Sequence, residues 1–352
     1  MKRRIAIVAG GLVAAVGLAV APSVVQADSP KDKPGDVVPT QTDLEKVKNY
    51  WTPERMSKAE PVVIKAPKKM EPAKQQPGKP KVIQGTKATA KKSAALEAEE
   101  GAPPWEGGGL VSKTAGKVFF EVDGTPFVCS ANVVPAKNKS LVSTAGHCVN
   151  DAHEQPAGTP GENVENFVFV PGYDGKLPEG EQAPYGVWPA KSITSHTLWA
   201  ANRESEEYPG YSTELWNYDV GFAVLAPQGG QNIQEVTGAQ SIAFNQPRGK
   251  FVGAFGYPAE DPYDGTTLRY CAGEPFDDPS DEPTNDQGLD CGLNGGASGG
   301  PWFQDFDDST GVGTQISVNS FTYLDDSGDR LGQMFGPYFG TSIQRFYEAV
   351  AD

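Results

Sequence analysis

Three short strings of residues carry side chains that together could perform acyl transfer. His147 stands beside Cys148, Asp219 stands at the head of an apolar run, and Ser298 lies among glycines. A serine hydroxyl becomes a nucleophile when a base takes its proton, and a carboxylate fixes the tautomer of that base. The glycines allow backbone N–H groups to face an oxygen that gains negative charge. Each string alone has an ordinary structural explanation, so the prediction rests on their conjunction.

The order of these residues along the chain excludes two other hydrolase folds. Residues 296–300 match the Gly-x-Ser-x-Gly nucleophile elbow of α/β-hydrolases, in which the histidine follows the serine. All histidines of this chain precede Ser298, and they are His147, His153 and His196. The subtilisin order needs an acid before His147, where Asp123 lies in a predicted hairpin turn. The order His, Asp, Ser remains.

Short strands must position these side chains. From residue 105 onward, apolar runs alternate with Gly, Pro, Asn and Asp, as in strands joined by turns. The predicted strands are 117–122, 126–134, 140–143, 166–170, 186–195, 220–225, 241–243, 251–256, 267–271, 300–303, 313–320 and 332–335. Hairpin turns are predicted at 123–124 and 326–328, and an amphipathic helix over 343–350. Twelve such strands favour a pair of packed barrels or a large sandwich.

Charge is unevenly distributed over the 352 residues. Residues 1–100 carry 18 basic and 11 acidic side chains, whereas residues 101–352 carry 12 basic and 34 acidic ones. The second part is therefore strongly acidic. Nucleic-acid binding needs clustered Lys and Arg, so we expect no nucleic-acid partner.

The N-terminal residues predict export. Residues 2–4 are basic, residues 5–20 are almost wholly apolar, and Val25-Gln26-Ala27 offers a small-x-small cleavage site. The apolar run is short for a membrane span, so a signal peptide over 1–27 is favoured over an anchor. The mature protein is then secreted, extracellular and free of the membrane, and its four cysteines can form disulfides in any of three pairings.

Residues 28–105 differ in texture from the rest of the chain. Lys, Pro, Ala, Gln and Glu dominate, and such a segment buries too little apolar surface to fold alone. Residues 42–51 are an exception, because their apolar side chains recur at helical spacing before Pro53. A solvated linker and a removable propeptide both fit this composition.

The three strings resemble those of the trypsin-like serine proteases, in particular the secreted bacterial branch that includes the glutamyl endopeptidases. Residues 144–148 read Thr-Ala-Gly-His-Cys, residues 219–222 read Asp-Val-Gly-Phe, and residues 296–301 read Gly-Ala-Ser-Gly-Gly-Pro. The resemblance implies an all-β domain over 106–352, with two perpendicular six-stranded antiparallel β-barrels and a C-terminal helix. It also implies a monomeric serine endopeptidase that acts on polypeptide substrates without a cofactor. The alternative is a non-catalytic protein of this fold that binds partners or cell wall.

The resemblance also assigns roles to single residues. His147 is the general base, Asp219 orients it, and Ser298 is the nucleophile, in the cleft between the barrels. The N–H groups of Gly296 and Ser298 form the oxyanion hole. In the family, a disulfide equivalent to Cys129–Cys148 holds the histidine loop, which leaves a Cys271–Cys291 pair before the nucleophile. A metal site built from these cysteines is disfavoured, because no C-x-x-C spacing occurs.

Two departures from the family pattern concern the loops around the nucleophile. Ala297 replaces the Asp that pairs with a newly formed N-terminus in animal trypsins, so other contacts must order the oxyanion loop. The insert 272–290 is acidic and could ligate Ca²⁺, although a solvated loop is favoured because the EF-hand glycine is missing. Its acidic residues include Asp277, Asp278, Asp281, Glu282, Asp286 and Asp290.

The resemblance carries less information about the substrate pocket. It places Ser317 opposite Asp219 and lines the pocket with Val318, Asn319 and Gly292. A neutral Gly292 disfavours an Arg/Lys-specific pocket, unless Asp290 enters it. We therefore expect a neutral or apolar preference.

Overall fold

The computed structural model describes residues 41–62, 64, 78–87, 96, 101–205, 212, 215–279, 284–325 and 329–352. The expected signal peptide and the hairpin turn at 326–328 lie outside these residues. Within them, no helix is both long enough and apolar enough to cross a bilayer.

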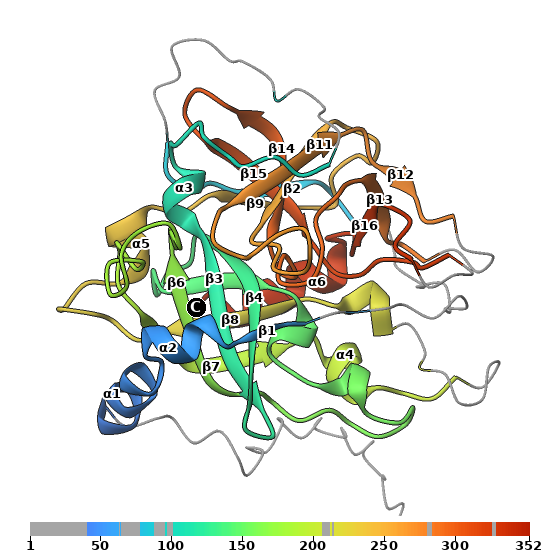
Figure 1. Cartoon of the computed structure of the whole chain (residues 1–352). Coiled ribbons are helices and arrows are strands. Elements are labelled where there is room, and N and C mark those ends of the chain that lie inside the picture. Colours follow the sequence, from blue (N-terminus) through green and yellow to red (C-terminus); the bar gives the residue numbers. More distant parts are fainter. Residues whose placement is uncertain are drawn as a thin grey trace, which may run out of the picture. The chain divides into compact units, whose positions relative to one another are not determined.

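The first half of the domain is a closed antiparallel barrel of six strands (Figure 1). Its strands run in the order β4-β3-β6-β7-β8-β5, and β5 pairs again with β4 to close the ring. They are β3 (Ala115–Val122), β4 (Thr125–Val133), β5 (Leu141–Thr144), β6 (Glu165–Pro171), β7 (Trp188–Ser195) and β8 (Gly221–Leu225). All six were predicted. Asp123 and Gly124 join β3 to β4 with φ of 50° and 77°, as a tight hairpin turn requires.

The second half contains two sheets, and Phe321, which follows the larger sheet along the chain, forms an isolated bridge with Phe335 in the smaller one. The larger sheet has the order β11-β10-β14-β15-β9-β2, and the smaller has the order β12-β13-β16. The larger is built from β9 (Ser241–Phe244), β10 (Val252–Gly256), β11 (Arg269–Gly273), β14 (Pro301–Asp307) and β15 (Val312–Val318), with β2 (Lys81–Ile83) at its edge. The smaller is built from β12 (Phe276–Asp277), β13 (Gln287–Asp290) and β16 (Gln333–Gly336). The all-β class is confirmed, although these strands do not form one continuous hydrogen-bonded ladder.

Sequence patterns missed β12 and β13, which lie in the acidic insert. Their polar residues lack the apolar alternation that marks a strand. Their strand conformation depends instead on hydrogen bonding, of β12 to β13 and of β13 to β16. The remaining elements are short helices and 3₁₀ turns: α3 (Val111–Thr114), α4 (Thr197–Ala201), α5 (Ile233–Thr237), α6 (Thr341–Val350), η1 (Gly146–Cys148), η2 (Ala152–Glu154) and η3 (Leu215–Tyr218). The predicted C-terminal helix is α6, which buries Ile343 and Tyr347.

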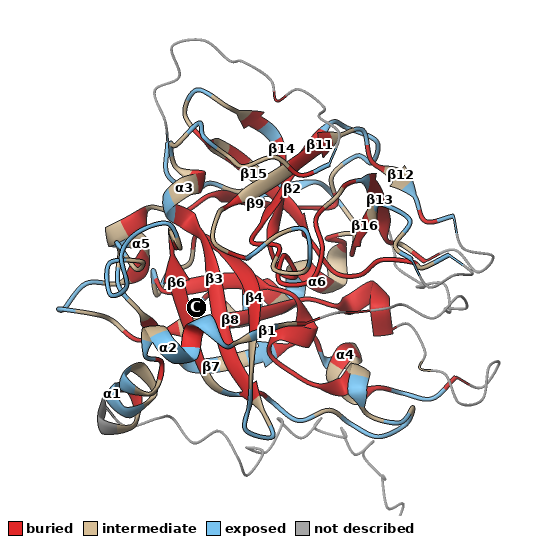
Figure 2. Cartoon of the chain, viewed as in Figure 1, coloured by how far each residue is buried: buried red, intermediate tan, exposed pale blue. Residues whose placement is uncertain are grey.

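Part of the low-complexity region packs onto the barrels. The predicted helix over 42–51 is confirmed as α1 (Gln41–Tyr50), followed by α2 (Pro53–Ser57) and β1 (Glu60–Pro61). Trp51 is buried, with its ring 5.6 Å from that of Phe119. β1 pairs with β4, and β2 pairs with β9. The described part of this region adds β1 and β2 to strands of the domain and buries Leu44, Trp51, Met56 and Val62, whereas Val82 is exposed. In Figure 2 most of α1 and α2 is coloured exposed or intermediate.

Candidate active site

His147 and Asp219 form a buried pair at the adjacent ends of β5 and β8, two neighbouring strands of the first barrel. His147 lies in η1, just after β5, and Asp219 lies just before β8. Nδ1 of His147 lies 2.7 Å from Oδ2 of Asp219, and the His147 backbone N–H donates to Oδ1 at 2.8 Å. Both side chains are fully buried. The carboxylate therefore fixes both the backbone position and the ring orientation of the histidine.

Asp219 is held in its charged form. Burial raises the pKa of this carboxyl group, but the charge of His147 and hydrogen bonds from His147 and Ser320 outweigh burial and lower the pKa below its ordinary value. The Ser320 hydroxyl donates to Oδ2. The resemblance placed Ser317 in this role, and that assignment is wrong: the Ser317 hydroxyl donates to the carbonyl of Pro337 at 2.8 Å. The chain turns out of β15 after Val318, which brings Ser320 to Asp219.

The histidine loop is fixed by close packing. A Cβ on Gly146 would lie 2.9 Å from Oδ1 of Asp219 and 3.0 Å from the Trp199 ring, so glycine is needed at this approach. The Trp199 ring lies 6.2 Å from the His147 ring. The expected disulfide between Cys129 and Cys148 is present and ties this loop to β4.

Ser298 lies on the loop that approaches His147 from the second half of the domain. Its carbonyl accepts from the Ser130 N–H on β4 at 2.7 Å and lies 3.8 Å from Sγ of Cys148. Nε2 of His147 is buried and has no hydrogen-bond partner among the described residues, so it makes no hydrogen bond to the Ser298 hydroxyl here. The three predicted residues thus come from segments in contact, and Nε2 of His147 has no hydrogen-bond partner among the described residues.

The N–H groups of Gly296 and Ser298 make no hydrogen bond to any residue in the described part of the chain. Gly296 has a φ of +91°, and a Cβ there would lie 2.8 Å from the Tyr257 carbonyl. Two free N–H groups beside a serine can stabilise negative charge on a substrate oxygen.

The residues expected to line the substrate pocket differ in exposure. Val318 and Asn319 are fully buried. Gly292 is half-buried, and its N–H lies 3.4 Å from the Gly101 carbonyl. Asp290 is exposed on β13 and accepts from the Gln333 amide at 3.0 Å. The Cys271–Cys291 disulfide is present and links β11 to the residue after β13.

His153 is a neighbour of the pair that sequence analysis gave no role. Its ring lies 5.7 Å from the His147 ring. Burial, followed by the charge of His147, lowers the pKa of His153 to about 3, against a smaller opposite effect of Asp219. His153 is therefore neutral at ordinary pH. Its spacing six residues after His147 gave no pattern that could have identified it.

The acidic insert offers no clustered ligand set in its described part. Asp277 pairs with Arg248, and Asp278 accepts from Thr284 and Tyr323. Burial raises the pKa of Asp286 well above its ordinary value. Asp281 and Glu282 lie outside the described residues. In the described ranges, the grouped metal-ligand types are Cys129, His147 and Cys148, whose two sulfurs are already bonded to each other.

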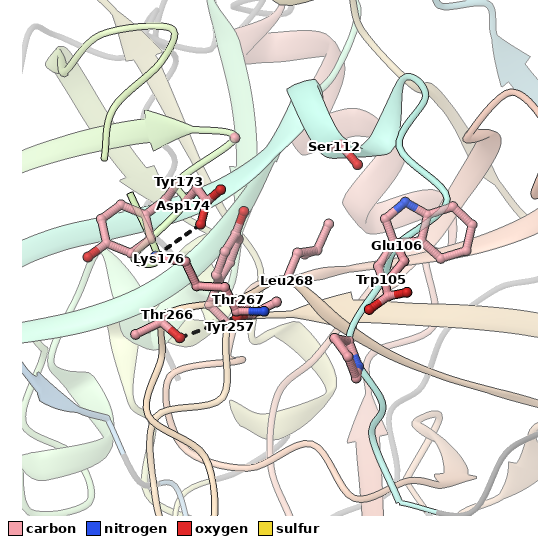
Figure 3. Close-up of a pocket in the computed structure, with 12 residues that line it drawn as sticks. Trp105, Glu106, Ser112, Tyr173, Asp174, Lys176, Tyr257, Thr266, Thr267 and Leu268 are labelled. Atoms are coloured by element: carbon pink, nitrogen blue, oxygen red, sulfur yellow. Dashed lines mark hydrogen bonds between the residues drawn. The ribbon is translucent and has the colours of Figure 1, made fainter. Parts of the chain in front are cut away.

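Figure 3 shows a cavity of about 260 Å³ that contains no member of the predicted triad. Tyr173, Asp174 and Lys176 line one side, and Trp105 and Glu106 line the other. The floor includes Tyr257, whose backbone borders Gly296. The cavity thus borders the loop that carries Ser298, and neither His147 nor Asp219 lines it.

The structure is similar to those of known proteases. Protease Anisep from Arthrobacter nicotinovorans is 40% identical over 68% of this chain and 95% of that chain, with a TM-score of 0.57. A thermostable serine protease, AL20, from an extremophilic microorganism is 39% identical over 69% of this chain and 98% of that chain, with a TM-score of 0.55. A Glu endopeptidase shares the fold at 14% identity, covering 72% of this chain and 97% of that chain, with a TM-score of 0.50. No family model and no curated protein matches the sequence.

Proposed function

This chain belongs to the bacterial trypsin-like serine proteases, and from that premise we propose that it is a secreted endopeptidase acting through His147, Asp219 and Ser298. The observation that carries the proposal is the buried His147–Asp219 pair, which leaves Nε2 without a partner beside the Ser298 loop. A buried polar nitrogen without a partner is costly in a purely structural role. Catalytic hydrogen bonds often form fully only when substrate binds.

The proposed reaction proceeds through an acyl-enzyme. His147 Nε2 takes the proton of the Ser298 hydroxyl as its oxygen attacks the substrate carbonyl, and Asp219 stabilises the charged imidazole. The N–H groups of Gly296 and Ser298 bind the oxygen of the tetrahedral intermediate. The protonated His147 then gives its proton to the leaving amine, and water attacks the acyl-enzyme by the same route.

For the residue before the cleaved bond we propose a neutral or apolar side chain. Leu293 precedes the oxyanion loop, Met334 lies on β16, and both are buried and apolar. Asp290 is the carboxylate that could have entered the pocket near Gly292. It is exposed and accepts a hydrogen bond from Gln333. No charge from these residues would pair with Lys or Arg in a substrate.

We propose that residues 28–105 are a propeptide that docks on the protease domain and is then removed. Trp51 donates to the Asn166 carbonyl at 2.5 Å, Tyr50 donates to Glu121, and Lys81 pairs with Glu348. These contacts join a basic segment to an acidic domain. A solvated linker would not need buried aromatic anchors.

The course of β1 supports an inhibitory role for this segment. β1 runs parallel to β4, with Pro61 opposite Val128, and Val62 is buried. Two residues beyond Val128, the Ser130 N–H contacts the Ser298 carbonyl. The segment thus follows an edge that leads to the nucleophile loop. We expect the uncleaved chain to be less accessible to substrate, and N-terminal sequencing of the secreted active enzyme to begin near residue 106. Retention of residues 41–62 in the active form would support a linker.

The experiment that tests the activity is labelling with a fluorophosphonate probe. Wild type should be labelled and should cleave a peptide library, whereas Ser298→Ala should do neither. Ser309→Ala, which removes an exposed serine on a turn, is the matched control and should behave as wild type. Equal labelling of wild type and Ser298→Ala, or no cleavage by wild type, would support the non-catalytic binding protein instead.

A further inference from the structure

The loop over residues 294–300 lacks the acidic residue that orders it in animal trypsins, because position 297 is Ala. Its order must come from contacts with other parts of the chain. The following inference rests on the proposed function and concerns what aims the two N–H groups of that loop.

A peptide unit is planar and trans, so fixing its C=O also fixes the direction of its N–H. The Gly295 carbonyl accepts from the Ala259 N–H at 2.7 Å, which turns the N–H of Gly296 to the opposite side. The Ala297 carbonyl accepts from Nδ2 of Asn319 at 2.9 Å, which turns the N–H of Ser298 to the opposite side. Both N–H groups are thereby left free, as described above.

Asn319 holds the second of these peptide units with a fully bonded amide. It is 0% exposed, and Nδ2 also donates to the Phe255 carbonyl at 2.8 Å. Oδ1 accepts from the indole N–H of Trp302 at 2.7 Å. Because an indole can only donate, the amide oxygen must face Trp302 and the nitrogen must face Ala297. The hydrogen-bond network therefore fixes the orientation of the amide.

Glu260 holds the other end of the loop. Its Oε2 accepts from the Gly295 N–H at 2.8 Å and from the guanidinium of Arg330. A Cβ on Gly295 would lie 2.9 Å from the Glu260 carboxyl carbon, so glycine allows this close approach. Asn294 adds a bond from its amide nitrogen to the Glu260 carbonyl at 2.9 Å. Arg330 balances a negative charge that would otherwise oppose the developing oxyanion.

We propose that Asn319 and Glu260 are positioning residues for the oxyanion hole, and that they replace the N-terminal ion pair of animal trypsins. Asn319 aims the N–H of Ser298 through the Ala297 carbonyl. Glu260 anchors the Gly295 N–H, and so holds the peptide unit just before the one that carries the N–H of Gly296. Neither side chain touches the substrate.

The test compares kcat and KM on a peptide substrate for Asn319→Asp, Glu260→Ala and Glu260→Gln. Asn319→Asp keeps the acceptor for Trp302 but repels the Ala297 carbonyl. We expect its kcat to fall about 10²–10³-fold with little change in KM, as for loss of one oxyanion-hole donor. Glu260→Ala should lower kcat by roughly tenfold, and Glu260→Gln should restore most of it, because the amide oxygen still accepts from Gly295. Affinity for a peptide boronic acid should fall in parallel with kcat.

Two control variants and an activity criterion keep the test decisive. Asn132→Asp changes another fully buried asparagine that bonds Gln315 rather than the loop, and Asp277→Ala removes another ion pair within the domain, the one with Arg248. Both should keep the kcat of wild type. Glu260 is 27% exposed, so its variants decide the matter if Asn319→Asp does not fold. The inference is wrong if wild type is active and Glu260→Ala retains its kcat, or if Glu260→Gln is as impaired as Glu260→Ala. An inactive wild type would instead refute the proposed function.

Discussion

The loop that carries His147 is fixed mainly by contacts between side chains. The loop that carries Ser298 is fixed by hydrogen bonds to its own backbone groups. The histidine is held by the Asp219 carboxylate, the Trp199 ring and the Cys129–Cys148 disulfide. The serine loop is held through its carbonyl and N–H groups. The proposed base must keep one ring orientation, which a side-chain contact sets directly. The proposed oxyanion donors are backbone groups, so contacts with neighbouring peptide units set their direction.

If this difference is correct, the largest effect should come from Asp219→Asn. The amide would keep the shape of the carboxylate but would favour the wrong histidine tautomer and lose the charge. We expect kcat to fall by about 10⁴-fold, as in the triad template, with folding retained. Asp290→Asn, which changes an exposed carboxylate on β13, is the matched control. A loss smaller than tenfold in Asp219→Asn would show that this side chain does not orient the base.

The two disulfides allow a direct comparison of the two loops, because they close loops of nearly equal length. Their sequence separations are 19 and 20 residues. Replacing either pair by Ala should lower the free energy of unfolding by about 3 kcal/mol, measured by urea denaturation. The effect on kcat should differ, because Cys148 adjoins His147, whereas the loop after Cys291 is still held by backbone hydrogen bonds.

We therefore expect the Cys129→Ala/Cys148→Ala variant to lose more kcat than the Cys271→Ala/Cys291→Ala variant, at similar loss of stability. Both should be assayed under conditions in which circular dichroism shows them to be folded. An equal loss of kcat would mean that the serine loop depends on covalent anchoring as much as the histidine loop does.

The same difference explains what the sequence could predict. The histidine side was predictable because its motif contains His147 and Cys148, and Asp219 begins a clear apolar strand. The contacts of the serine side come from distant residues such as Glu260 and Asn319, which belong to no local pattern. The resemblance therefore assigned to Ser317 the contact with Asp219 that Ser320, three residues later, makes. Which serine reaches Asp219 depends on the residue at which β15 ends. The alternation of apolar residues in the sequence does not define that residue.

The smallest predicted effect is a loss of stability at acidic pH. It also distinguishes the two halves of the domain, because all three histidines precede residue 200. Burial lowers the pKa of His196 to about 4. Its Nδ1 accepts from the Leu198 N–H at 3.2 Å at the start of α4, and Nε2 lies 2.9 Å from the Ser342 hydroxyl. The neutral ring is needed, since a protonated Nδ1 could not accept. The unfolded chain binds a proton below pH ~6.5, while the folded chain does so only near pH 4. Stability from this group is therefore complete above pH 6.5 and is lost as the pH falls toward 4.

His196→Asn tests this prediction, because asparagine can cap α4 but does not titrate. The slope of unfolding free energy between pH 4.5 and 6.5 should fall by roughly 1 kcal/mol per pH unit relative to wild type, measured by urea denaturation. Ser342→Ala removes the partner of Nε2 but keeps the titrating ring, so it should retain the slope of wild type. His153, also neutral because of burial, contributes in the same direction in all three proteins and cancels in the comparison. Coincident slopes for wild type and His196→Asn would show that acid acts elsewhere, and that the histidine half is not the acid-sensitive part of the domain.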